Sequence, residues 1–489
     1  MISGKEKIKK VFQKKWWLVL GIIVFFLRLP SLFEPFIYGD EGIYLTLGQA
    51  IRKGLVLYKD IHDNKPPLLY SLAALAGNFS YYRAILFLWS FITIYLFYKL
   101  SFLLFKNKSA QIISTFIFAI LTSIHTFEGN VGNAENFMTL PTLGGFYFFL
   151  KAKKWQHYFF AGILFSLATL FKVPAAFDFA AALVFFLTLF LSKKNKNYSL
   201  FIIHYSLFIC GFLVPILATF AYYASKNALN FYLSAAFFQN LPYLASWTPD
   251  KTKIANLPLP LLIRAILLGI ALILVFLYRK KISLMTKVLL IWFSFSLFAA
   301  LLSSRPYPHY LLQVIPSLSF SFGLLTEKNK EKFIPLFLFF CLVFSFLYFK
   351  FWHYPNISYY LNFYQFALGQ KTKDEYFNYF GKETKYLYQV AQYLKLYTTP
   401  QEKIFLWGNQ PSIYALAERL PSTRYTVVYH IVDFNTYQET MNTLNKNPPR
   451  YIIIHNEEEK LLKELFYFVY PNYLPTFKFG DFTIFKLKK

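Results

Sequence analysis

The chain has 489 residues, of which 56% are hydrophobic, and it carries 51 lysines and arginines against 24 aspartates and glutamates. This apolar content excludes a soluble protein of ordinary composition. The basic residues fall in small clusters between long apolar runs, such as Lys99 to Lys108 and Arg279 to Lys281. That spacing argues against nucleic acid as a partner and indicates a polytopic α-helical protein surrounded by membrane lipids.

The first predicted element is an apolar segment at 16–33. We interpret it as a retained membrane anchor, because no small-residue cleavage site follows it. Ten further segments are each near the roughly 20 residues that a bilayer requires. Because basic clusters stay in the cytoplasm, we expect a cytoplasmic N-terminus and an extracytoplasmic C-terminus. The eleven predicted spans are 16–33, 82–104, 109–126, 138–151, 157–172, 174–191, 200–224, 260–278, 284–303, 309–326 and 333–350.

Acidic residues concentrate in the breaks that lack the lysine clusters. These breaks are therefore predicted to face away from the cytoplasm and to hold most of the polar chemistry of the membrane region. The eight acidic residues are Glu34, Asp40, Glu41, Asp60, Asp63, Glu128, Glu135 and Asp250.

The first extracytoplasmic loop, 34–81, is predicted to contain a helix that starts near Asp40 and ends near Gly54. Four apolar positions of this helix share one face at helical spacing, and we expect that face to rest on the membrane surface. They are Tyr44, Leu47, Ala50 and Ile51.

Two adjacent carboxylates, Asp40 and Glu41, open that helix. Adjacent carboxylates repel each other, so chemistry explains the pair better than folding does. We interpret them as a catalytic pair, in which Asp40 is a general base for a hydroxyl group and Glu41 tunes it. The alternative is structural, with Asp40 as the N-cap and Glu41 favouring the helix dipole.

Lys65 stands directly before Pro66-Pro67 in the same loop. A lysine ammonium is a compact charge suited to phosphate, and the prolines fix the chain direction after it. The alternative is a surface lysine before a helix. The nearby Asp60, His62 and Asp63 lack a specific metal-ligand spacing, so no metal is predicted, and a divalent ion is kept only as an alternative.

Two further loops carry polar motifs. Asn133-Ala134-Glu135-Asn136 lies between the third and fourth spans, where the Glu135 carboxylate is expected near membrane depth and ionisable groups usually have a function. Ser304 to Tyr310 precedes the tenth span, and Arg305, His309 and Tyr310 are donors suited to an anion. Lys172 could add charge there. The alternatives are a solvated loop and an interfacial anchor.

Residues 351–489 have a different pattern, in which apolar segments of strand length alternate with helical ones. This predicts a small extracytoplasmic α/β domain. Strands are predicted at 403–407, 425–430, 451–455, 475–479 and 482–487, and helices at 412–419, 435–444 and 457–468.

These motifs resemble the membrane-embedded GT-C glycosyltransferases, and most of all the protein O-mannosyltransferase branch, which includes bacterial enzymes that transfer aminoarabinose to lipid A. The resemblance covers roughly residues 10–350. The residues that carry it are Gly39-Asp40-Glu41, Tyr44, Tyr58-x-Asp60, Lys65-Pro66-Pro67-Leu68, Asn133-Ala134-Glu135-x-Phe137-Met138-x-Leu140-Pro141 and Arg305-x-x-x-His309-Tyr310 with Pro316.

The resemblance implies a GT-C transmembrane catalytic domain at 1–350, catalysis by Asp40 and phosphate contact by Lys65. We expect an inverting transfer of a sugar from a polyprenyl phosphate to a hydroxyl of a lipid, glycan or protein. Arg305, His309 and Tyr310 would contact the donor phosphate, with Tyr58, Asp60, His62, Glu135 and Asn136 as secondary sugar or acceptor contacts.

Two other classes of protein predict different patterns. A transporter or flippase of lipid-linked sugars predicts charges at the middle of the spans and internal repeats, whereas here the polar motifs gather at one predicted face. A non-catalytic sensor or scaffold gives no reason for Asp40-Glu41 beside a set of cations. The sequence therefore favours the glycosyltransferase, in a bacterial inner membrane.

Overall fold

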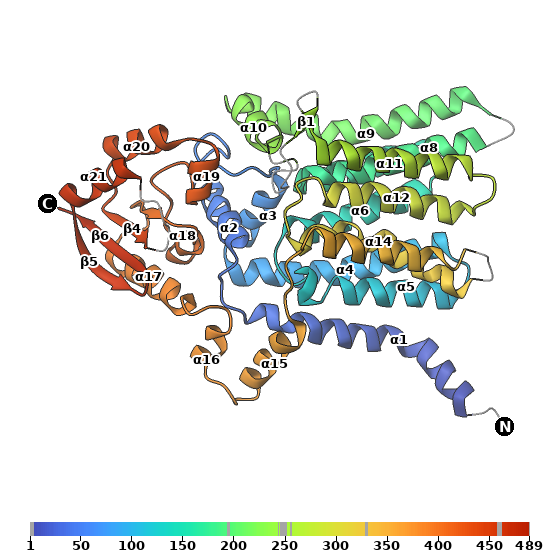
Figure 1. Ribbon diagram of the computed structural model, residues 1–489, viewed down its shortest axis with the longest axis horizontal. Coiled ribbons are helices and arrows are strands. Elements are labelled where there is room, and N and C mark those ends of the chain that lie inside the picture. The colour runs from blue at the N-terminus through green and yellow to red at the C-terminus, as the bar shows by residue number, and fades with distance from the viewer. Residues whose placement is uncertain are drawn as a thin grey trace. The chain divides into compact units, whose positions relative to one another are not determined.

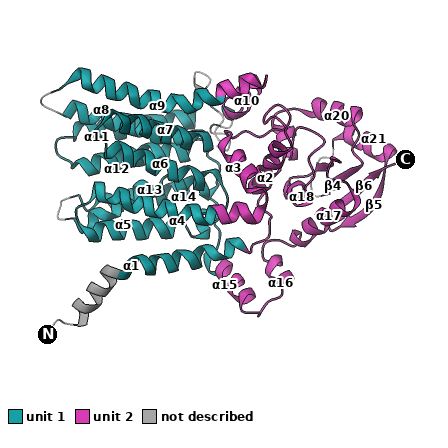
Figure 2. Ribbon diagram, turned by 180° about the vertical axis from the view of Figure 1, so that it is seen from behind, with its two compact units in different colours: residues 1–32, 86–219, 241–357 teal, residues 33–85, 220–240, 358–489 magenta. Residues whose placement is uncertain are grey.

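The computed structural model describes residues 4–192, 196–242, 244, 252–254, 257–327, 331–456 and 462–488. Asp250 and the first residues of the helix predicted at 457–468 lie outside them. The chain divides into two compact units (Figure 2). Unit 1 comprises residues 1–32, 86–219 and 241–357, and unit 2 comprises residues 33–85, 220–240 and 358–489.

Unit 1 is a bundle of apolar helices that run side by side (Figure 1). Each predicted span coincides with a helical segment. Its elements, including two helices that cross into unit 2, are α1 Gly4–Arg28, η1 Leu29–Leu32, α4 Phe79–Leu104, α5 Lys108–Leu121, η2 His125–Phe127, α6 Ala134–Leu150, α7 Trp155–Phe171, η3 Val173–Ala175, α8 Ala176–Ser192, α9 Tyr198–Ser225, β1 Lys253–Ile254, β2 Leu257–Pro258, α11 Leu259–Leu277, α12 Leu284–Ala300, η5 Pro308–Gln313, α13 Ile315–Gly323, η6 Leu324–Thr326 and α14 Ile334–Tyr348.

Five helical stretches of the described chain are long and apolar enough to cross a bilayer, and these helices make the chain an integral membrane protein. Shorter apolar helices accompany them, so the predicted number of eleven spans stays a prediction. The five stretches are Lys15–Leu32, Phe79–Leu104, Val173–Ser192, Tyr198–Ser225 and Leu259–Leu277.

Aromatic stacking and close backbone contacts hold the bundle together. Phe97 of α4 lies between Phe118 of α5 and Phe320 of α13, with ring centroids 4.1 and 3.8 Å away. Where α7 crosses α9, a methyl group on Gly211 would lie 2.1 Å from the Phe159 carbonyl oxygen. Only a residue without a side chain allows this approach, as is common between membrane helices.

Unit 2 combines the first loop with the C-terminal segment around a four-stranded sheet. The sheet order is β3-β4-β6-β5, with β3 parallel to β4 and the other pairs antiparallel. Its elements are α2 Gly39–Arg52, α3 Leu68–Ala76, α10 Leu229–Ala236, η4 Phe238–Asn240, α15 Asn356–Ala367, α16 Lys373–Asn378, α17 Thr384–Tyr397, β3 Phe405–Trp407, α18 Ser412–Ala417, α19 Val428–Asp433, α20 Tyr437–Lys446, β4 Tyr451–His455, α21 Lys463–Asn472, β5 Tyr473–Phe479 and β6 Phe482–Leu487.

Each face of the sheet buries its own apolar cluster. Leu406 and Ile453 pack on α17 and α18, whereas Phe405 and Ile452 pack on the side of α19, α20 and α21. This alternation follows from the pleat, which turns successive side chains to opposite faces. The predicted small α/β architecture of the C-terminal segment is therefore present.

The strand predicted at 425–430 is wrong, because α19 occupies residues 428–433. The β-branched and aromatic residues of this segment favour a strand locally. However, Val428 and Ile431, three positions apart, bury together when the segment is helical, and the Val428 N–H bonds the Gly408 carbonyl just beyond the end of β3. Tertiary packing decides the conformation here.

The helix predicted after Asp40 is present as α2, but its apolar face does not rest on a membrane. Tyr44, Leu47 and Ala50 have no exposed surface, because protein covers them within unit 2. Two glycines allow this packing. A methyl group on Gly42 would lie 2.6 Å from the Ser412 nitrogen of α18, and one on Gly48 equally close to the Ala74 nitrogen of α3.

Candidate functional site

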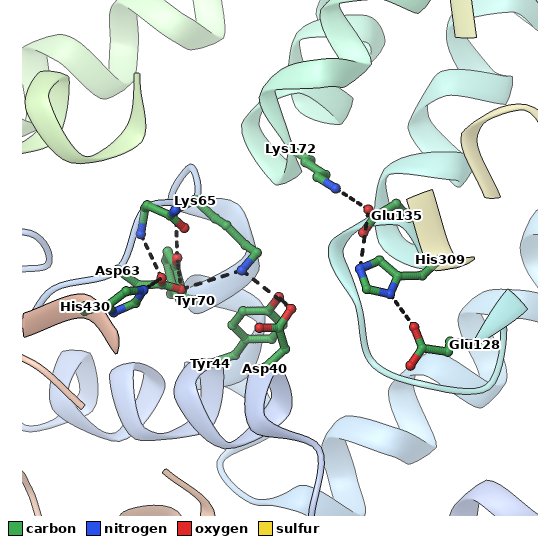
Figure 3. A network of polar contacts seen from close by, with 11 residues as sticks. Asp40, Tyr44, Asp63, Lys65, Tyr70, Glu128, Glu135, Lys172, His309 and His430 are labelled. Carbon is green, nitrogen blue, oxygen red and sulfur yellow. Dashed lines mark hydrogen bonds and ion pairs between the residues drawn. The ribbon is translucent and has the colours of Figure 1, made fainter. Parts of the chain in front are cut away.

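Asp40 and Lys65 lie together in unit 2, as the sequence predicts for two parts of one site. The Lys65 Nζ is 3.6 Å from Asp40 Oδ2, and the Asp40 side chain is 34% exposed (Figure 3). Tyr44, one helical turn after Asp40, donates its hydroxyl to the same oxygen at 2.8 Å. Burial raises the pKa of the Tyr44 phenol well above its ordinary value, so this hydroxyl remains a donor.

Asp40 is not the N-cap residue of α2, which was the structural alternative to a catalytic role. Tyr38 is the N-cap residue of α2, and in the described chain its side chain does not cap the helix N-terminus with a hydrogen bond. Asp40 lies inside the first turn, where a negative charge is favoured by the helix dipole. Its carboxylate is directed to Tyr44 and Lys65, which leaves an acidic group that is accessible and held between two donors.

Buried side chains fix the backbone of Lys65. Tyr58 donates its hydroxyl to the Lys65 carbonyl at 2.8 Å, and the Lys65 N–H donates to Tyr70 Oη at 3.1 Å. Tyr70 in turn donates to Asp63 Oδ2 at 2.6 Å, and this oxygen is 4.0 Å from Lys65 Nζ. Lys65 therefore has an ordered backbone and a side chain between two carboxylates.

Glu41 is fully buried and pairs with Arg83 of α4. The Arg83 Nη2 and Nε donate to Glu41 Oε2 at 2.8 and 3.0 Å, and Nη1 donates to the Glu34 carbonyl at 2.8 Å. Sequence reasoning missed Arg83. The available signal was a charged residue at the second position of a predicted span, because ionisable groups at membrane depth normally have a partner.

The other residues of this loop that were predicted to contact the sugar or the acceptor are Asp60, Tyr58 and His62, and their side chains are either hydrogen-bonded or buried within the protein itself. Asp60 is exposed and accepts the Val56 N–H at 2.7 Å within its own turn. The Tyr58 ring is buried and stacks on Tyr232. His62 is 1% exposed, and neither ring nitrogen has a hydrogen-bond partner within the described part of the chain. Among the described residues, no three His, Cys, Asp or Glu side chains are grouped to hold a metal ion.

We expect the free energy of unfolding to fall as the pH drops below about 6.5, partly through His62. Burial, with His430 and Arg424 nearby, lowers the pKa of His62 well below its ordinary value. A neutral ring is thus favoured in the folded state, and its contribution is complete above pH 6.5 and lost as the pH falls. The loss is about 1.4 kcal/mol per pH unit until the folded-state pKa is reached.

Thermal melting in detergent at pH 7.5 and 5.5 tests this for the wild type and His62→Phe. Because Tyr425 and Phe434 already surround the ring, phenylalanine fits the site. The variant should lose less stability at the lower pH, and equal losses would contradict the assignment. Burial also lowers the pKa of His430, so part of the pH dependence should remain.

Unit 1 holds a second polar cluster, made by Glu128, Glu135, Lys172 and His309 (Figure 3). Lys172 pairs with Glu135 in the first turn of α6, and His309 Nδ1 pairs with Glu128. The His309 Nε2 lies 3.9 Å from Glu135 Oε1. Both ring nitrogens therefore face carboxylates, which differs from the predicted contact of His309 with a phosphate.

Two of the other predicted residues of unit 1, Tyr310 and Asn136, contact members of this cluster. Lys172 lies 3.8 Å from the ring centroid of Tyr310 in a cation–π contact. Asn136 donates to the carbonyls of Glu128 and Val131 at 3.0 and 2.8 Å, and so shapes the loop that presents Glu128. Arg305 is half-buried and lies four residues before His309 in the chain. Sequence reasoning gave Glu128 no role, because a loop residue carries no signal of a partner far along the chain.

No protein-family model matches the chain, and no curated protein matches its sequence. Its structure is similar to two crystal structures of ArnT from Cupriavidus metallidurans, one bound to undecaprenyl phosphate and one in the apo state. Both have a TM-score of 0.57 and 12% sequence identity, and cover 96% of this chain and 97% or 98% of ArnT. The Archaeoglobus fulgidus oligosaccharyltransferase, crystallised with Zn and sulfate, has a TM-score of 0.43 and 14% identity, covering 90% of this chain and 68% of that one.

At this level of identity, the likeness to ArnT shows the fold. The chain therefore has an ArnT-like membrane fold over nearly its whole length. The fold expected from the sequence resemblance is confirmed.

Proposed function

We propose that this protein is an inverting glycosyltransferase, which moves a sugar from a polyprenyl phosphate to a hydroxyl group of a lipid, glycan or protein. The observation that carries the proposal is the pairing of an accessible carboxylate, Asp40, with the Lys65 ammonium at 3.6 Å. The fold supports the lipid donor, because ArnT, a lipid A aminoarabinose transferase, was crystallised with undecaprenyl phosphate.

In this mechanism Asp40 accepts the proton of the acceptor hydroxyl. The acceptor oxygen forms a bond to the anomeric carbon while the bond from that carbon to the phosphate oxygen breaks. The bonding electrons stay on the phosphate, and Lys65 stabilises the charge that develops there. Because attack and departure take place on opposite sides of the carbon, the anomeric configuration inverts.

Tyr44 gives Asp40 a defined orientation, because its hydroxyl donates to one carboxylate oxygen at 2.8 Å. Glu41 has a positioning role in this proposal, since its carboxylate is buried against Arg83.

Arg305 and Tyr310 remain predicted contacts of the donor phosphate. In this proposal His309 orients the carboxylates of Glu128 and Glu135. Together with Lys172, these carboxylates bind hydroxyl groups of the sugar or the acceptor. We propose the extracytoplasmic face of a bacterial inner membrane as the location of the reaction, because a lipid-linked donor is available there and nucleotide sugars are not expected.

A donor panel tests the proposal. The purified full chain is incubated with polyprenyl phosphates that carry different sugars, together with a mixture of envelope lipids as acceptors. We expect at least one donor to release free polyprenyl phosphate and to yield a product with the opposite anomeric configuration. Release should fail with Lys65→Ala. A product that retains the configuration, or equal release by Lys65→Ala, would overturn the mechanism.

A further inference from the structure

The C-terminal segment of unit 2 reaches the loop that carries Lys65. The backbone N–H of His62 donates to the Arg424 carbonyl at 2.9 Å, and the next residue, Asp63, faces His430 of α19. There His430 places its Nε2 3.5 Å from Asp63 Oδ1 (Figure 3). A residue far along the chain thus contacts the carboxylate that lies beside the proposed phosphate-binding lysine.

Asp63 is 1% exposed, so donors of the protein must stabilise its negative charge in place of water. The two carboxylate oxygens have different neighbours. Oδ2 accepts the Tyr70 hydroxyl and lies 4.0 Å from Lys65 Nζ, whereas Oδ1 accepts the Asn64 N–H at 2.8 Å and faces His430. His430 is therefore the side chain on the Oδ1 side that can hold the carboxylate in its present orientation.

The surroundings of His430 indicate why a histidine matters at this position. The ring is 3% exposed, it stacks on Phe434 with centroids 5.3 Å apart, and its Nδ1 has no hydrogen-bond partner among the residues that the structure describes. An unsatisfied buried acceptor destabilises the folded state, and an apolar ring of similar shape would avoid that cost. The contact of Nε2 with Asp63 is what such a ring would lack.

We propose that His430 is a positioning residue for Lys65 and acts through Asp63, an inference that rests on the proposed function. With Nε2–H directed at Oδ1, the Asp63 carboxylate keeps Oδ2 toward Tyr70 and Lys65. Without that donor, the Asp63 charge is less compensated and attracts the Lys65 ammonium more strongly. The ammonium is then displaced from Asp40 and from an incoming phosphate, so the C-terminal segment forms part of the donor site.

Binding of undecaprenyl phosphate to the full chain in nanodiscs tests this inference. His430→Phe keeps the ring and removes the N–H, and it should weaken binding about tenfold. His430→Gln places an amide N–H near the Nε2 position and should bind within about twofold of the wild type. His455→Phe is the matched control, because His455 is also 3% exposed and also pairs with a carboxylate, Glu383, at 3.0 Å. It should bind as the wild type does.

The outcomes separate this inference from the proposed function. If Lys65→Ala loses binding while His430→Phe keeps it, the role of His430 is overturned and the transferase proposal stands. If the wild type does not bind, or Lys65→Ala binds equally well, the donor site itself is overturned. Should His430→Phe fail to fold, the double variant Asp63→Asn/His430→Phe takes its place, because it removes the uncompensated charge together with its donor. It should bind as Asp63→Asn alone does, and a further loss of binding would refute the inference.

Discussion

Asp40→Asn should lower the rate of sugar transfer by about 10²–10⁴-fold, the usual contribution of a general base, while the protein remains folded. An amide has the shape of the carboxylate but cannot accept the proton. The Tyr44 hydroxyl, now 2.8 Å from Asp40 Oδ2, can still donate to the amide oxygen. Because the Asp40 side chain is 34% exposed, no buried charge is created or lost.

The measurement is release of free polyprenyl phosphate at saturating donor, together with a melting curve for each protein. Asp374→Asn is the control, since Asp374 is an exposed acid in the first turn of α16. It should leave both the rate and the melting temperature unchanged. Near-normal turnover by Asp40→Asn would reject Asp40 as the base, whatever the donor proves to be.

The residues of unit 2 with a local motif could be predicted from the sequence, and their partners could not. Asp40 and Lys65 stand out because a carboxylate pair and a Lys-Pro-Pro run are unusual in a membrane loop. Arg83 and His430 complete the surroundings of Glu41 and Asp63 only after the chain has folded. No periodicity links such distant positions, so local pattern reasoning cannot pair them.

The same limit explains the misplaced face of α2. A stripe of apolar residues indicates that one face is removed from water, but not what covers it. Here Gly42 and Gly48 allow α18 and α3 to approach, so protein covers residues that equally fit a membrane surface. The pattern predicted the helix and its buried side. Which part of the protein covers that side depends on the packing of the folded chain.

Arg83→Leu should lower the free energy of unfolding by about 3–5 kcal/mol, as removal of one partner of a buried ion pair does. The Glu41 carboxylate would lose donors now at 2.8 and 3.0 Å in a place without exposed surface. The Glu34 carbonyl would lose the guanidinium as well. Chemical denaturation of the purified full chain, followed by tryptophan fluorescence, measures the change in the free energy of unfolding.

The double variant Arg83→Leu/Glu41→Leu removes both charges and should recover most of that stability, though not all, because the Glu34 carbonyl still lacks its donor. The recovered protein then distinguishes two roles for Glu41. If Glu41 only positions α2, the folded double variant should retain most of its sugar-transfer rate, since Asp40 and Lys65 are unchanged. If Glu41 instead tunes Asp40 as part of a catalytic pair, as the sequence alone suggests, the double variant should fold and remain inactive. A stable but inactive double variant would therefore indicate that Glu41 takes part in catalysis together with Asp40.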